Sequence, residues 1–106
     1  MKTPIAAAAL AGAVVLAPIA AHAQAEEALA SKSGCLACHA VDKKVVGPSY
    51  KEVANKYRGD KAAPAKLEKK VKEGGVGVWG QIPMPPNSQV NDADIKKLVA
   101  WVLSLK

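Results

Sequence analysis

The feature that most limits how this chain can fold is the run from Cys35 to His39, which reads Cys-Leu-Ala-Cys-His. Two thiols separated by two residues can each form a thioether with one vinyl group of a porphyrin, and the histidine that follows then places an imidazole on the iron. A chain with this pattern has to fold around a large flat group beside the motif. We therefore expect one covalently attached haem c, held by Cys35 and Cys38, with His39 as an axial iron ligand.

Two other interpretations of the motif can be weighed from the residues alone. A structural zinc site needs four nitrogen or sulfur ligands, and residues 24–106 supply only Cys35, Cys38 and His39. A redox-active dithiol of the thioredoxin kind requires a βαβ context, and the sequence shows no strand pattern. The motif therefore favours haem over zinc binding and over dithiol chemistry.

The N-terminal segment has the composition of a secretory signal peptide. Lys2 precedes an apolar stretch, and residues 21–23 read Ala-His-Ala, an A-x-A cleavage site. The alternative is a retained membrane anchor, because the stretch approaches the roughly 20 residues that span a bilayer. Alanine dominates the stretch and Pro18 interrupts it, which favours cleavage. We expect residues 1–23 to be a cleaved signal peptide and residues 24–106 to be one exported domain.

The expected mature domain is too small for an ordinary hydrophobic core to be secure. It has 83 residues (24–106), it contains no Phe, and its large aromatic residues are Tyr50, Tyr57, Trp79 and Trp101. Domains of this size usually need a disulfide, a metal or another covalent link for stability. A buried porphyrin tied by two thioethers would meet that need, so we expect the haem to have a structural role as well.

The charge balance bears on the partners of the domain. The whole chain carries +6 at pH 7, and removal of Lys2 leaves 14 basic against 9 acidic residues, a net charge near +5. A basic surface favours acidic protein partners through long-range steering. The exported chain has no stripe of basic and aromatic residues, so nucleic acid is not expected as a partner.

Helix start and stop signals predict an all-α architecture. Ser49 and Glu52 form a capping box at the start of one helix, and Asn91 and Asp94 cap the last one. We predict a helix over 26–33 stopped by Gly34, a helix that opens at Ser49 and ends before Gly59, a helix over 64–73 stopped by Gly74-Gly75, and a last helix after Asn91. That last helix has apolar residues at helical spacing: Ile95, Leu98, Val99, Trp101, Val102 and Leu105.

The second axial ligand has to come from another part of the chain, because His39 is the only histidine in residues 24–106. The only methionine there is Met84, in the run Ile-Pro-Met-Pro-Pro within the Gly- and Pro-rich segment 74–88. Three prolines restrict the backbone around it, and a thioether suits the iron of electron-transfer haems. An ordinary methionine in a Pro-rich loop is the alternative. With both axial positions filled, the iron favours electron transfer over catalysis.

Several segments carry a family resemblance: Gly-Cys-Leu-Ala-Cys-His at 34–39, Val-Gly-Pro at 46–48, Gly-Val-Trp-Gly at 77–80, Ile-Pro-Met-Pro-Pro-Asn at 82–87 and Trp-Val-Leu-Ser at 101–104. Together they resemble small bacterial class I cytochromes c of the 551 type, over residues 26–106. The resemblance implies the small class I cytochrome c fold, with about four short helices around one covalent haem. Members often have an aromatic residue where this chain has Ala30, so either Leu29 and Trp101 fill the space or the helices pack closer.

The resemblance also implies roles for three residues near the haem. Pro48 would offer its backbone carbonyl to the ring N–H of His39. Trp79 would donate its indole N–H to a haem propionate, and Asn87 would hydrogen-bond the sulfur of Met84. Taken alone, the same residues are better explained as an ordinary turn proline, a core aromatic residue and a turn-forming asparagine, and only the resemblance favours the roles at a haem.

In function, the resemblance implies a monomeric periplasmic electron carrier rather than an enzyme. It would move single electrons between a quinol-oxidising complex and a terminal reductase or oxidase, with nitrite reductase as the partner most associated with the type. Docking would be transient, and Lys32, Lys43 and Lys44 are candidates for its rim, although each taken alone is better explained as ordinary solvated surface. Three alternatives are a haem-based gas sensor, a peroxidase-like enzyme with a labile sixth ligand, and a permanently bound haem subunit of an oxidoreductase.

Overall fold

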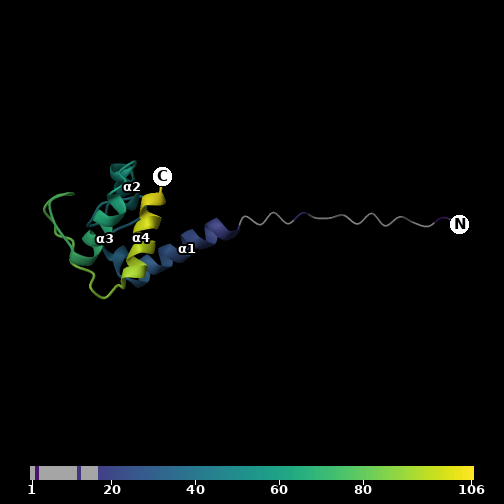
Figure 1. Cartoon of the computed structure of the whole chain (residues 1–106), viewed down its shortest axis with the longest axis horizontal. Helices are drawn as coiled ribbons and strands as arrows, with labels where there is room; N and C mark the ends of the chain where they lie inside the picture. Colours follow the sequence, from purple (N-terminus) through teal and green to yellow (C-terminus); the bar gives the residue numbers. More distant parts are fainter. Residues whose placement is uncertain (1, 3–11, 13–16) are drawn as a thin grey trace.

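The computed structural model describes Lys2, Gly12 and residues 17–106, and these residues form an all-α fold (Figure 1). No strand occurs among them beyond two isolated β-bridges. The elements are α1 (Ala17–Lys32), the short 3-10 helix η1 (Cys35–Ala37), α2 (Tyr50–Tyr57), α3 (Ala63–Glu73) and α4 (Asp92–Ser104). The predicted architecture is confirmed.

Helix α4 is the centre of the packing and contacts α1, α2 and α3 (Figure 1). Its buried residues are those that the apolar spacing singles out: Ile95, Leu98, Val99, Trp101 and Val102. Leu105, expected to continue the stripe, lies just after the helix as its C-terminal cap. An apolar stripe wide enough to face three neighbours explains why this helix organises the others.

The ends of the helices follow the capping residues of the sequence. The Ser49 hydroxyl accepts a hydrogen bond of 3.1 Å from the backbone N–H of Glu52 at the start of α2. Asn91 does the same for Asp94 at the start of α4, at 2.8 Å. Each such cap contributes about 1 kcal/mol. Gly74, directly after α3, has a φ of 75° and a ψ of −173°, a backbone conformation that glycine adopts far more readily than other residues.

Helix α1 is longer than predicted, because it begins at Ala17 rather than at residue 26. Alanine has the highest helix propensity, and Pro18 lies in the first turn, where its missing N–H costs no helical hydrogen bond. Most of the expected signal peptide, residues 1–23, falls outside the described residues, so its cleavage stays a prediction. No helix within the described part of the chain is both long and apolar enough to span a membrane.

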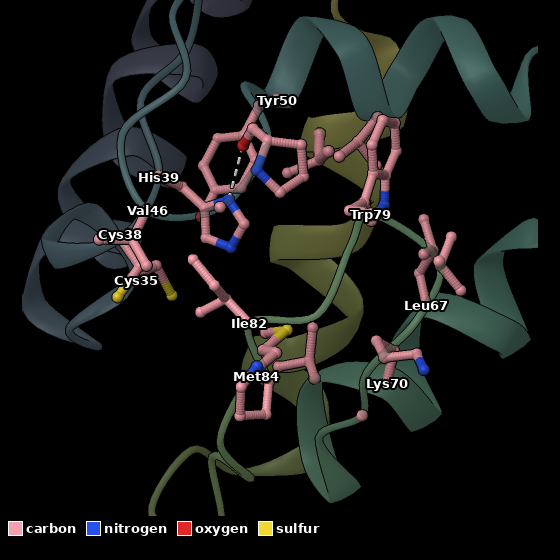
Figure 2. A pocket seen from close by; sticks show the side chains of 18 of the residues that line it. Cys35, Cys38, His39, Val46, Tyr50, Leu67, Lys70, Trp79, Ile82 and Met84 are labelled. Carbon is pink, nitrogen blue, oxygen red and sulfur yellow. Dashed lines mark hydrogen bonds between the residues drawn. The ribbon is translucent and has the colours of Figure 1, made fainter.

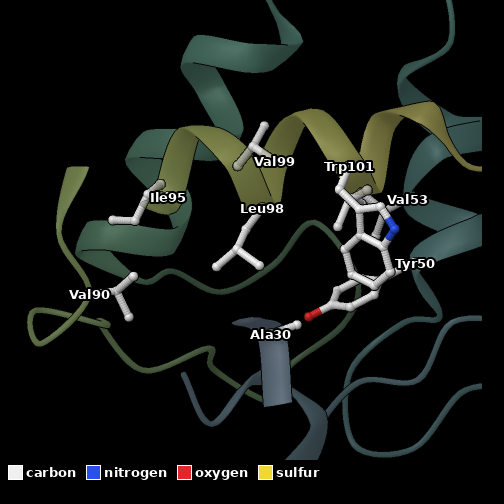
Figure 3. Packing of buried hydrophobic residues seen from close by; sticks show 9 residues of the cluster. Ala30, Tyr50, Val53, Val90, Ile95, Leu98, Val99 and Trp101 are labelled. Atoms are coloured by element: carbon white, nitrogen blue, oxygen red, sulfur yellow. The ribbon is translucent and has the colours of Figure 1, made fainter. Parts of the chain in front are cut away.

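The core between α1, α2 and α4 is small and rich in aromatic contacts (Figure 3). Ala30 is completely buried in it, and Leu29 packs against the same cluster. The rings of Tyr50 and Trp101 meet edge to face, and both side chains belong to the same buried cluster as Ala30 (Figure 3). These side chains, together with the small size of Ala30 itself, complete the α1–α4 contact without an aromatic residue at position 30.

Candidate functional site

A cavity of about 370 Å³ opens between η1, α2, α3, α4 and the segment after α3. Its volume falls in the range of about 300 to 1,000 Å³ that proteins use for small molecules and cofactors. The lining includes every residue for which the sequence predicts a role at a haem: Cys35, Cys38, His39, Pro48, Trp79, Met84 and Asn87. These residues are distributed from Cys35 to Asn87 in the sequence, and the fold brings them to one cavity (Figure 2).

The two cysteines and the histidine are brought together by a tight turn. Gly34 has a φ of 83° and allows α1 to stop where η1 begins. The backbone N–H groups of Cys38 and His39 both donate to the carbonyl of Cys35, at 3.2 and 3.0 Å. Both thiols are free and half-buried, and they lie at one edge of the cavity (Figure 2). Burial raises the pKa of the Cys35 thiol, with a hydrogen bond from Tyr50 acting in the opposite direction.

The His39 imidazole is oriented by the loop that precedes α2. Its Nδ1 lies 2.7 Å from the carbonyl oxygen of Pro48. A carbonyl can only accept, so Nδ1 carries the proton and Nε2 is left as the basic nitrogen that can bind a metal. This is the contact that the family resemblance implies for Pro48. A hydrogen bond of this kind fixes the ring and raises its basicity as a ligand.

Met84 is held by a loop that the backbone closes on itself. Gly75 and Met84 form an isolated antiparallel bridge, with N–H to carbonyl hydrogen bonds of 3.0 and 2.8 Å. We call residues 75–84 the strap. The backbone of Met84 also passes so close to Gly74 that a Cβ at that position would collide with the Met84 carbonyl. Gly74 therefore lets the chain return close to the end of α3, and the bridge from Gly75 fixes the place of Met84.

Trp79 lies at the tip of the strap and lines the cavity, although 41% of its surface is exposed. The ammonium of Lys56, on α2, lies 5.6 Å from the centre of the Trp79 ring. A cation over an indole face is attractive, so this contact joins the strap to α2. The hydrogen bond from Trp79 to a haem propionate stays a prediction.

Asn87 makes contacts other than the one that the resemblance implies. Its Nδ2 donates to the carbonyl of Val71 at 3.0 Å and to that of Pro85 at 3.3 Å. An amide nitrogen has two hydrogens, and these two bonds use both. A hydrogen bond to the Met84 sulfur would require one of them to be released, so that role stays a prediction. In the structure, Asn87 joins the segment that follows the strap to the last turn of α3.

The chemistry of the cavity fits a haem. Its walls are apolar side chains from three helices, and several apolar residues around its mouth are exposed: Val46, Val76, Val78, Trp79 and Ile82. A cluster of exposed apolar side chains at one place on the surface usually marks a site where another apolar group binds. His39 and Met84 face the same space from different sides, with the two thiols at its edge (Figure 2). A c-type haem uses two thiols for its covalent attachment to the porphyrin, and an imidazole and a thioether as ligands of its iron.

The sequence did not reveal three features of the site. The bridge between Gly75 and Met84, the close approach of Gly47 to His39, and the stacking of Tyr50 on His39 all depend on pairings across the fold. In the sequence, the adjacent glycines at 74–75 indicate only a helix stop. They were also the available signal for a backbone crossing, because glycine is common where two backbones approach closely.

Known proteins carry the same pattern. The family model for cytochrome c matches residues 23–106. Cytochrome c-551 of Allochromatium vinosum is 59% identical over 87 residues, which cover 82% of this chain and 93% of that protein. Cytochrome c-552 of Nitrosomonas europaea is 53% identical over 88 residues, covering 83% and 85% of the two chains.

A solved structure supports the same conclusion at the level of the fold. The crystal structure of wild-type Nitrosomonas europaea cytochrome c552 matches with a TM-score of 0.74 and 54% identity, over 76% of this chain and 99% of that one. These relatives share more than half of their residues with this chain over most of their length, whereas two proteins can share a fold at far lower sequence identity. The chain therefore belongs to the cytochrome c family, as a small all-α class I member of the 551 type: an electron-transfer protein with one covalently attached haem c.

Proposed function

We propose that this protein is a periplasmic carrier of single electrons whose haem iron has His39 and Met84 as its axial ligands. The observation that carries the proposal is the convergence of these two side chains on one apolar cavity, with Cys35 and Cys38 at its edge. When bound, the haem supplies reversible one-electron chemistry at its iron. The protein residues hold the ligands, exclude water and limit rearrangement between the two oxidation states.

The ligand assignments rest on how each side chain is held. Pro48 keeps the proton of His39 on Nδ1, which leaves Nε2 for the iron. Met84 is the only methionine of residues 24–106, and the bridge to Gly75 fixes its backbone. A thioether ligand raises the reduction potential relative to a second nitrogen ligand. With both positions filled, the iron has no site for oxygen or peroxide.

The proposal also includes export and transient partners. The family match begins at residue 23, beside the expected cleavage site, which supports a signal peptide over 1–23. The basic charge and the exposed apolar residues around the cavity suit short-lived docking with acidic redox proteins. We propose a quinol-oxidising complex as the donor and a nitrite reductase or terminal oxidase as the acceptor, with the carrier itself a monomer.

Optical spectra of the purified protein test the ligand set. We expect a covalent c-type spectrum, a far-red band from sulfur bound to ferric iron, and no change when carbon monoxide is added to the ferrous form. Met84→Ala should abolish the far-red band, lower the reduction potential and allow carbon monoxide to bind. Gln89→Ala, an exposed residue of the loop that follows the strap and outside the cavity lining, is the matched control and should keep all three wild-type properties.

The outcomes separate the proposed carrier from its alternatives. Ready binding of carbon monoxide by the wild-type protein would mean a labile sixth ligand, and would support a sensor or a peroxidase-like enzyme. Copurification with a dehydrogenase or oxidase at high salt would support a permanent subunit. A Met84→Ala protein with an unchanged potential would disprove the methionine assignment.

A further inference from the structure

We propose that Tyr50 is a positioning residue that sets the orientation of the His39 imidazole, and through it the axial ligand of the haem. The inference rests on the proposed function, because it concerns the same ligand. Tyr50 does not bind the iron in this proposal, and it acts only through His39. The sequence presents it merely as one of the large aromatic residues of the mature domain.

The first observation is a stacked contact between the two rings. The ring centres of His39 and Tyr50 lie 4.9 Å apart, and the ring planes differ by only 19°. Figure 2 shows the Tyr50 ring beside the imidazole, next to the hydrogen bond from His39 to Pro48. The flat face of the imidazole is therefore covered by another flat ring rather than by mobile aliphatic groups.

This contact restrains a motion that the Pro48 hydrogen bond leaves open. A carbonyl oxygen accepts hydrogen bonds over a broad range of directions. The bond to Nδ1 therefore holds one ring atom in place but allows the ring to tilt about it. A nearly parallel, buried ring at this distance resists that tilt, because tilting would drive one edge of the imidazole into the face of Tyr50 in a close-packed interior. Gly47, close to Cε1 of His39, limits the ring further.

Tyr50 can restrain His39 because its own position is fixed. It is the first residue of α2, only 8% exposed, and its backbone N–H donates to the Ala40 carbonyl at 2.9 Å. Its ring meets Trp101 edge to face, with centres 5.5 Å apart and planes at 76° (Figure 3). Trp101 belongs to α4, the helix that packs against all the others. The imidazole is thus tied to the centre of the fold.

The first test uses the unaltered holoprotein in its ferrous, diamagnetic form. Proton NMR should show nuclear Overhauser contacts between the ring protons of Tyr50 and those of His39. It should also show contacts between the rings of Tyr50 and Trp101. Absence of the His39–Tyr50 contact in a protein that carries covalent haem would overturn the inference, while a protein without covalent haem would overturn the proposed function instead.

Variants test whether the contact sets the ligand orientation. In low-spin ferric haem, the order and spread of the four haem methyl resonances depend on the planes of the axial ligands. Tyr50→Phe keeps the ring and should keep the wild-type order, whereas Tyr50→Leu should change it. Ile95→Ala is the matched control, because Ile95 is deeply buried in α4 but does not line the cavity.

The control separates positioning from simple loss of stability. Ile95→Ala should lower the melting temperature and leave the methyl pattern unchanged. A wild-type pattern in Tyr50→Leu, or an equal change in Ile95→Ala, would overturn the inference. If Tyr50→Leu does not fold, the ring contacts in the wild-type protein decide the question.

Discussion

At the scale of single residues, the loop before α2 works because one position has no side chain. A Cβ at Gly47 would lie 2.6 Å from Cε1 and 3.0 Å from Nδ1 of His39, closer than such atoms approach in proteins. Pro48, the next residue, provides the carbonyl that accepts the proton of Nδ1. Any larger residue at position 47 would therefore push the loop away from the imidazole and lengthen that hydrogen bond.

We predict that Gly47→Ala displaces His39 and weakens its bond to the iron. The variant should attach less haem and show a lowered reduction potential together with a lower melting temperature. Gly59→Ala is a suitable control, because Gly59 has a φ of 83° but no atom within 4 Å of an added Cβ. That control should lose some stability through backbone strain and keep the wild-type potential. Equal potentials in all three proteins would contradict the prediction.

At the scale of elements, the end of α3 is held through one carbonyl to the segment that follows the strap. The Val71 carbonyl accepts from the backbone N–H of Asn87 and from its Nδ2, both at 3.0 Å. Carbonyls in the last turn of a helix have no partner inside the helix. Asn87 therefore caps α3 and at the same time fixes the chain three residues after Met84.

We predict that Asn87→Ala destabilises the protein by about 1 kcal/mol through loss of its side-chain hydrogen bond to Val71. Denaturant unfolding measures this, with Asn55→Ala on the exposed face of α2 as the control. The reduction potential separates the two roles of Asn87. A loss of stability with an unchanged potential would support capping alone, and a shifted potential would support the additional contact with the Met84 sulfur.

The start of α3 makes stability depend on pH. Asp60 accepts a hydrogen bond of 2.9 Å from the N–H of Ala62 and pairs with Lys66 at 3.1 Å. The hydrogen bond from Ala62, followed by Lys66, lowers the pKa of Asp60 below its ordinary value. A carboxyl whose pKa is lower in the folded state stabilises the fold above its unfolded pKa. That contribution is lost as the pH falls through the folded pKa.

We therefore predict that Asp60→Ala lowers the melting temperature at pH 7, and that the difference from wild type disappears in acid below the folded pKa. Thermal unfolding followed by circular dichroism across this range measures the effect. Asp42→Ala removes the same charge from an exposed loop and should show a smaller difference at pH 7. A difference for Asp60→Ala that stays constant into acid would contradict the assignment.

The sequence predicts the helices better than the contacts between them, because the interactions that begin and end a helix act between residues close together in the chain. The caps at Ser49 and Asn91 act within three residues, so local patterns reveal them. The prediction of a start at residue 26 is wrong for α1, because the alanines within residues 17–23 favour a helix as well as a signal peptide. The contact of Gly75 with Met84 joins residues that only the folded chain brings together.

At the scale of the whole molecule, the protein core is incomplete without another apolar group. Ile95 is the largest side chain among the described residues that is fully buried, and the walls of the cavity are apolar. Helices α2, α3 and α4 face this cavity together, so a group bound there would contact all three. Burial of apolar surface contributes about 25 cal/mol per Å², and a covered porphyrin would add a large area to a small core.

We predict that the double variant Cys35→Ala with Cys38→Ala, which cannot attach haem covalently, loses cooperative folding. Its far-UV circular dichroism should show less helix than wild type, and its thermal transition should be broad or absent, because the cavity walls would be left exposed to water. Ala37→Ser changes the exposed residue between the cysteines and should keep both haem and cooperativity. A haem-free double variant with a sharp transition near the wild-type melting temperature would show that the polypeptide core suffices, and the haem would then have no structural role.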